Sequence, residues 1–188
     1  MRILVGIRAS SYLTTRMEKR KITSEAYFRM LMILYAAMVM SQFTLVGTMI
    51  FLQQTGEIGG ADPSLTPIGM YALIAGATLG ILGSNVIGNM LILKARSKPT
   101  LAEKLRGYQT ASIIRYALLE LPTALGMVGF FSSGQYWYFI FTGIAIAFFL
   151  MIIPRKDKIC EVLQLSHEEI QLVNDPKAVI MEQEISND

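Results

Sequence analysis

Four long hydrophobic stretches alternate with polar segments along this chain of 188 residues; they cover residues 27–52, 68–93, 111–131 and 136–153. Each reaches the length of roughly 18 apolar residues that marks a candidate transmembrane helix. Residues 1–26 form a basic arm, and residues 154–188 return to the mixed pattern of short soluble helices. The pattern therefore predicts an all-α membrane protein whose core, residues 27–153, is a four-transmembrane-helix bundle.

The basic residues gather on one side of the predicted spans. Most of the 17 Lys and Arg residues lie at the start of the first span, between the second and third spans, or after the fourth: Arg2, Arg8, Arg16, Lys19, Arg20, Lys21, Arg29, Lys94, Arg96, Lys98, Lys104, Arg106, Arg155, Lys156 and Lys158. The loop between the first two spans contains Glu57 and Asp62 but no basic residue. This asymmetry predicts that both termini are cytoplasmic. The basic arm could also lie against anionic lipid.

The third stretch carries Arg115, Glu120 and Pro122 inside an otherwise apolar run. A charge inside a span costs at least ~2.5–3.5 kcal/mol, so such residues indicate a site or an internal helix contact. A rise of ~1.5 Å per residue puts Glu120 near mid-bilayer. Other polar residues fall within reach of that depth, and we predict a membrane polar layer that contains Glu120, Arg115, Asn85, Asn89, Gln42 and Thr142, with Ser41 and Thr123 nearby.

Two interpretations of Glu120 remain open. It could be a hydrogen-bonded or protonated residue that locks the helices together, or it could bind a proton or another cation. Arg115 stands five residues away on the same predicted helix, which is a strained spacing for an ion pair. We therefore expect the Arg115 side chain to extend towards the cytoplasmic face.

Small residues recur every four positions along the second span. They are Ala72, Gly76, Gly80, Ser84 and Gly88. Such a ridge lets two helix backbones approach closely in a membrane. It predicts a close helix contact, either within the chain or between two copies.

Polar residues also predict where helices begin. Thr100 and Glu103, and later Ser166 and Glu169, have the spacing of capping boxes. No helix-breaking residue separates the Thr100–Glu103 capping box from the third span. One long helix is therefore expected from residue 101 onwards. The acidic C-terminal end is expected to be frayed.

The sequence contains no nucleophile–base pair, metal-ligand cluster or phosphate-binding loop. We predict no catalytic residue, no metal site, no cofactor and no nucleic-acid partner, and hence a protein that is not an enzyme. Cys160 is the single cysteine, so an intrachain disulfide is impossible. His167, the single histidine, is expected on the exposed start of a soluble helix.

The run LAEKLRGYQTASIIRYALLELPTALGMVGFF, continued by IIPRKDKICEVLQLSHEEIQL, resembles an uncharacterised family of small bacterial inner-membrane proteins with four predicted helices. The resemblance implies a bacterial inner (plasma) membrane and no established activity. A weaker likeness is to the rotor-ring proteolipid hairpins of rotary ATPases. Their Gly-rich helix, basic loop and mid-membrane carboxyl would correspond to residues 76–88, residues 96–99 and Glu120. Here, however, the glycines are spaced by four rather than two, and two further helices are present.

These features favour a non-enzymatic, multi-pass inner-membrane protein that acts as an accessory, assembly or scaffold subunit. Its expected partners are the lipid bilayer and either further copies of itself or other membrane subunits. One alternative is a small proton-coupled transporter or ion-translocating oligomer that uses Glu120. Another is a lipid-associated membrane organiser that uses the basic arm.

Overall fold

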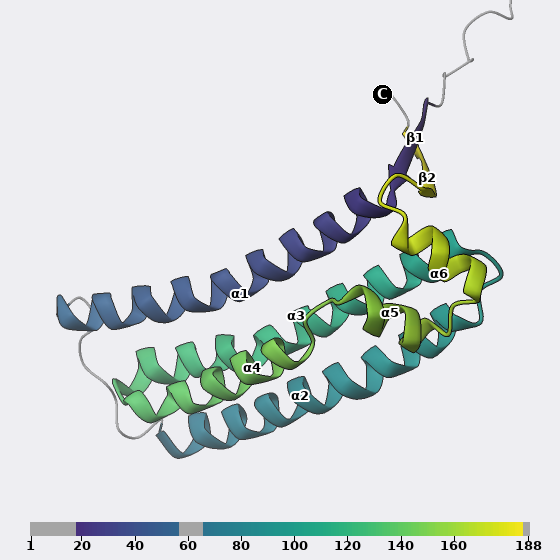
Figure 1. Cartoon of the computed structure of the whole chain (residues 1–188). Helices are drawn as coiled ribbons and strands as arrows, with labels where there is room; N and C mark the ends of the chain where they lie inside the picture. Colours follow the sequence, from purple (N-terminus) through teal and green to yellow (C-terminus); the bar gives the residue numbers. More distant parts are fainter. Residues whose placement is uncertain (1–17, 57–65, 186–188) are drawn as a thin grey trace, which may run out of the picture.

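A computed structural model describes residues 18–56 and 66–185 of the chain. The elements, in chain order, are β1 Glu18–Thr23, α1 Ser24–Gln54, α2 Thr66–Arg96, α3 Leu101–Ser133, the 3-10 helix η2 Tyr136–Tyr138, α4 Phe139–Met151, α5 Lys156–Leu163, α6 His167–Asn174 and β2 Val179–Ile185. Helices α1 to α4 run side by side, and the two strands lie with α5 and α6 at one end of them (Figure 1). The predicted helical class is confirmed, with a two-stranded sheet added.

Three helices, α1, α2 and α3, are long and apolar enough to cross a membrane. A fourth crossing is obtained if residues 136–151 and α5 count as one span, but those segments are bent by 80°. The fourth stretch is thus less regular than its sequence predicted. Helix α4 has 13 residues, or about 20 Å, and it ends before Pro154. Proline disfavours helical geometry at the preceding residue, which helps to end the helix there.

Helix α3 is the long continuous helix that its sequence predicted. The Thr100 side chain accepts a hydrogen bond from the Glu103 backbone N–H at 3.3 Å and so caps the helix start. The helix then runs for 33 residues and ends at Gly134. Gly134 has φ = 66°, a left-handed conformation that glycine adopts without steric cost.

The parallel helices α1 and α3 meet at three levels. Their polar contacts join residues that are 78, 79 and 81 positions apart, namely Tyr27 to Leu105, Ser41 to Glu120, and Gln53 to Gly134. The nearly constant separation fixes which residues of the two helices lie at the same height. Gln42 is therefore level with residues 121–122 of α3.

Helix α2 lies against α3 through its small residues. A Cβ atom on Gly76 would lie 2.0 Å from Leu125 Cδ1, and one on Gly80 would lie 2.7 Å from the Leu118 carbonyl oxygen. Ser84, on the same face of the helix, is 2% exposed. The two backbones can approach this closely only because the face of α2 carries almost no side-chain volume.

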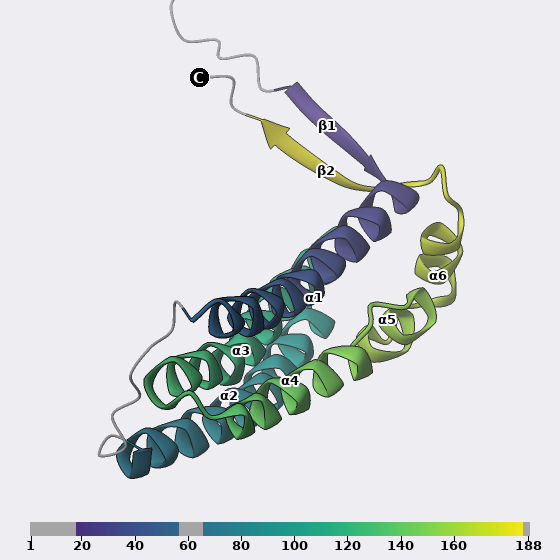
Figure 2. The ribbon, with the colours of Figure 1, turned by 90° about the vertical axis from the view of Figure 1, so that its left-hand side faces the viewer.

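The strands and the two short helices form one unit, which we call the cap (β1, α5, α6 and β2). Its apolar core contains Ile159, Cys160, Leu163, Leu165, Val173, Ile180 and Met181 of the cap. The adjoining ends of the three long helices add Tyr27, Leu31, Ala95 and Leu105. Figure 2 shows the antiparallel strands extending from the start of α1. Three segments distant in sequence, residues 27–31, 95–105 and 159–181, therefore share one core at this end of the bundle.

The C-terminal end is not frayed as far as Ile185, so this prediction is wrong for residues 179–185. Strand β2 pairs with β1, and the pairing sets Glu182 opposite Lys21. Opposite charges on facing residues favour the pairing. Residues 1–17 and 186–188 lie outside the described part, but residues 18–23 of the basic arm pair with the acidic tail.

Lys104 of α3 holds α6 through Glu169. Lys104 Nζ lies 2.9 Å from both carboxylate oxygens of Glu169, and the two side chains are only 14% and 16% exposed. Glu169 also completes the predicted capping box with Ser166. Burial alone would raise the pKa of Glu169, but the hydrogen bonds from Lys104 and Ser166 and the charge of Lys104 together lower it below its ordinary value.

We therefore expect acid to loosen α6. Because the pKa of Glu169 is lower in the folded than in the unfolded chain, its contribution to stability is present above the unfolded value of ~4.3 and lost as the pH falls through the folded value. Glu169→Gln should cost about 1–3 kcal/mol at neutral pH and should weaken the pH dependence below about pH 4. Thermal unfolding across this range measures both effects. Glu168→Gln, an exposed neighbour, is the control, and identical pH profiles for wild type and Glu169→Gln would contradict the assignment.

Candidate functional site

Glu120 lies where α3 meets α1. Ser41 Oγ is 3.3 Å from Glu120 Oε1 and 2.7 Å from the carbonyl oxygen of Met38. A serine hydroxyl has one proton to donate, and the shorter contact with Met38 is the better hydrogen bond. The half-buried carboxyl group of Glu120 is thus left with a weak donor at most on this side.

Three neutral side chains of the same region have buried oxygen atoms with no hydrogen-bond partner among the described residues. The atoms are Gln42 Oε1, Thr123 Oγ1 and Thr142 Oγ1. Gln42 and Thr123 are each 1% exposed and Thr142 is 2% exposed. A buried polar group without a partner costs about 1–3 kcal/mol. Three such groups close together make this region more polar than the apolar helix contacts around it.

Helix contacts place these oxygen atoms at neighbouring heights. The register of α1 on α3 sets Gln42 one to two residues from Thr123 in height. On the α4 side, a Cβ atom on Gly126 would lie 3.2 Å from Thr142 Oγ1, and Gly126 is three residues after Thr123. Three residues rise ~4.5 Å along a helix. Gln42 and Thr123 therefore lie within about one helical turn of Glu120 in height. Thr142, level with Gly126, lies about one turn further from the cap than Thr123. We call these four residues the polar layer.

The remaining polar residues that we predicted for the layer lie elsewhere. A Cβ atom on Gly88 would lie 2.4 Å from Arg115 Cδ, so the Arg115 side chain covers α2, whereas Glu120 faces α1. Asn85 Nδ2 donates to the Ile81 carbonyl oxygen of its own helix at 3.1 Å, and Asn89 is exposed.

Sequence reasoning missed an aromatic cluster one turn from Glu120 towards the cap. Tyr35 donates its hydroxyl proton to the Phe149 carbonyl oxygen at 3.2 Å, and Tyr116 stacks on the Phe149 ring at 5.7 Å. These rings close the α1–α3–α4 interior on the cap side of the polar layer. The sequence did hold a sign of this cluster. Tyr35 and Tyr116 lie inside the apolar stretches, away from the membrane interfaces where tyrosine is common.

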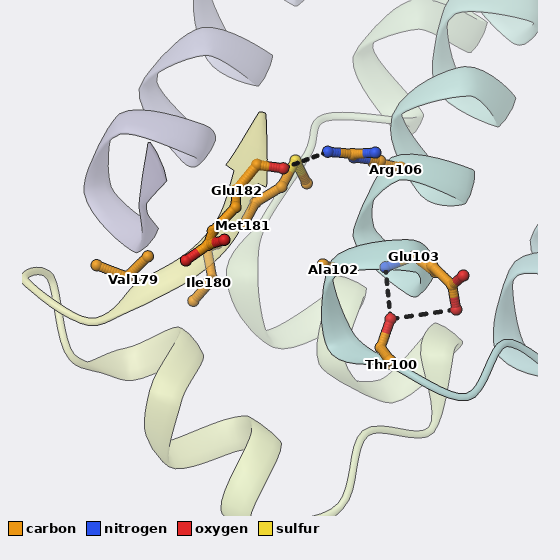
Figure 3. A pocket seen from close by; sticks show the side chains of 8 residues that line it. All are labelled: Thr100, Ala102, Glu103, Arg106, Val179, Ile180, Met181 and Glu182. Atoms are coloured by element: carbon orange, nitrogen blue, oxygen red, sulfur yellow. Dashed lines mark hydrogen bonds between the residues drawn. The ribbon is translucent and has the colours of Figure 1, made fainter. Parts of the chain in front are cut away.

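A second feature is a shallow pocket of about 400 Å³ at the cap, between the start of α3 and β2 (Figure 3). Its lining residues are Thr100, Ala102, Glu103, Arg106, Val179, Ile180, Met181 and Glu182. Figure 3 shows Arg106 reaching across to the backbone carbonyl of Glu182, to which it donates a hydrogen bond. This contact ties α3 to β2 and uses the one basic side chain that lines the pocket.

A scan against protein-family models, a search of curated proteins and a search of solved structures each found no match for this chain. We therefore infer the function from contacts within the molecule.

Proposed function

We propose that this chain is a non-enzymatic, multi-pass protein of a bacterial inner membrane and acts as an accessory, assembly or scaffold subunit of a membrane complex. Both termini are proposed to be cytoplasmic. The apolar outer surface of the long helices, which includes Ile33, Leu79 and Val128 at 61–67% exposed, suits a lipid environment.

The main support for this proposal is the position of the cap. Its folded core sits at the end of the bundle where the basic segments also lie, which is the cytoplasmic end under the positive-inside rule. The cap carries two exposed apolar side chains, Leu172 and Val179, each 46% exposed. A folded unit with such residues, tied to α3 by Lys104 and Arg106, is suited to bind another cytoplasmic or membrane subunit.

Purification of the tagged full-length chain in mild detergent tests the accessory role. We expect another subunit to co-purify with the wild type in fixed stoichiometry. It should not co-purify with the Leu172→Glu variant, which alters only the exposed face of the cap. The exposed change His167→Ala is the control. A pure homo-oligomer from wild type would contradict the accessory role.

A second candidate, a small proton-coupled transporter or ion-translocating oligomer, is favoured by Glu120. A carboxyl group in the middle of the spans is costly to keep ionised without a partner. The contact with Ser41 is long, and Arg115 faces a different helix. Glu120 therefore has the environment expected of a group that exchanges a cation.

Replacing Glu120 separates the two candidates. Glu120→Gln keeps the shape and hydrogen-bonding groups but cannot release a proton, so a transporter should fold and show only background flux. In a scaffold, Glu120→Gln should function as wild type does, whereas Glu120→Ala should lose about 1–2 kcal/mol of stability. Flux or growth assays and thermal unfolding measure these effects. If Glu120→Gln functions normally while Glu120→Ala is destabilised, the translocation candidate is wrong.

A further inference from the structure

The threonines described within helices α1 to α4 fall into two groups. Thr44, Thr48, Thr78 and Thr110 are exposed, and each donates its hydroxyl proton to the carbonyl oxygen four residues earlier, at 2.7–3.1 Å. This is the ordinary way for threonine to satisfy its hydroxyl in a helix. Thr123 and Thr142 are buried and do not make this bond. Their hydroxyl oxygens are available to the α1–α3–α4 interior instead.

The charge of the region points to the kind of ligand. Glu120 brings one formal negative charge, and the three neighbouring oxygen atoms are neutral hydroxyl or amide groups. Ser41 Oγ, whose proton is directed to Met38, keeps a lone pair near Glu120. Among the titratable groups nearby, Arg115 covers α2 and Tyr35 and Tyr116 lie a turn lower. One carboxylate with neutral oxygen ligands matches a hard cation of single charge.

We propose that Glu120, Gln42, Thr123 and Thr142 form a binding site for an alkali cation between α1, α3 and α4. The cation offsets the charge of Glu120 and coordinates the buried oxygen atoms that have no partner among the described residues. This proposal rests on the second candidate function in that both use Glu120, but it requires only that the cation binds, not that it is transported. It is independent of the accessory role of the cap.

Thermal unfolding of the purified full-length chain in detergent tests this site. LiCl, NaCl, KCl and choline chloride are compared at equal ionic strength, because choline is too large to enter. At a concentration about tenfold above its Kd, at least one alkali ion should raise the Tm of wild type by roughly 3–6 °C relative to choline. Thr123→Val, which replaces the hydroxyl by a methyl group, should abolish the difference. Thr123→Ser, which keeps the oxygen, should retain it.

Two further variants complete the test. Thr78→Val removes an exposed hydroxyl that bonds to its own helix, and it should retain the full salt effect. Glu120→Gln removes the charge and should abolish the effect even if Thr123→Val does not fold. The proposal is overturned if the Tm of wild type is the same in all four salts, or if Glu120→Gln keeps the effect. An alkali effect without flux would leave the site standing and reject transport, whereas flux that depends on Glu120 without an alkali effect would reject the site and leave proton transport standing.

Discussion

Deleting residues 175–188 should release the start of α1 from the rest of the molecule. The tail supplies hydrogen-bond acceptors for that helix: the Ser24 N–H donates to the Ala178 carbonyl oxygen at 2.9 Å, and the Glu25 N–H donates to the Pro176 carbonyl oxygen at 3.3 Å. The first N–H groups of a helix have no partner inside it, so these contacts act as an external cap. The tail also carries β2, the only partner of β1 among the described strands.

The expected loss of stability is large. Ile180 and Met181 of β2 are each 5% exposed, and burial of such side chains contributes about 1.5–3 kcal/mol each. With the two lost N–H contacts, the deletion should cost about 5 kcal/mol or more. Thermal unfolding and protease resistance of the region around Ser24 measure the effect. Deletion of residues 186–188 alone is the control and should change neither; a stable, protease-resistant chain without residues 175–188 would show that the cap does not hold α1.

Gly80→Leu should disrupt the α2–α3 contact. Even a single added carbon at Gly80 would lie 2.7 Å from the Leu118 carbonyl oxygen and 2.9 Å from Pro122 Cδ. Neither atom can move freely, because one belongs to the backbone and the other to a proline ring. Pro122 has no N–H to donate to Leu118, so the freed carbonyl group lies directly beside the glycine.

Overpacking of this kind typically costs about 1–3 kcal/mol, and a full leucine should cost at least that much. Two glycines offer matched controls. A Cβ atom on Gly83 would be 3.7 Å from its nearest neighbour, and one on Gly47 would meet nothing within 4 Å. Gly83→Ala and Gly47→Ala should therefore leave Tm unchanged or raise it slightly. If Gly80→Leu unfolds at the temperature of wild type, the two helices do not pack at this face.

The sequence allowed much of the helical framework to be predicted because its signals are local. The capping residue Thr100 and the turn-forming Gly134 act within a few positions of the helix ends they determine. The position of Glu120 in the interior of one long helix likewise follows from counting residues along the chain. In contrast, Arg115 and Glu120 point to different helices, and only the packing of α1 and α2 on either side of α3 determines this.

The sheet could not have been predicted from local pattern. Strands β1 and β2 are more than 150 positions apart, with Lys21 facing Glu182, and each is a short charged segment that would not be stable alone. Their pairing depends on the bundle, which brings the start of α1 and the end of α6 to the same place. The short α4 was also hidden, because composition records how apolar residues 136–153 are but not where the helix ends.

Topology reporters test whether the chain is a multi-pass membrane protein with both termini in the cytoplasm. A reporter fused after Asp188 should be active only in its cytoplasmic form, and the same reporter inserted after Gly60 should be active only in its periplasmic form. This pair of results requires the chain to cross the membrane an odd number of times between residue 60 and its end. Periplasmic activity of the fusion after Asp188 would contradict the account, since the cap and its basic segments would then lie outside the cytoplasm.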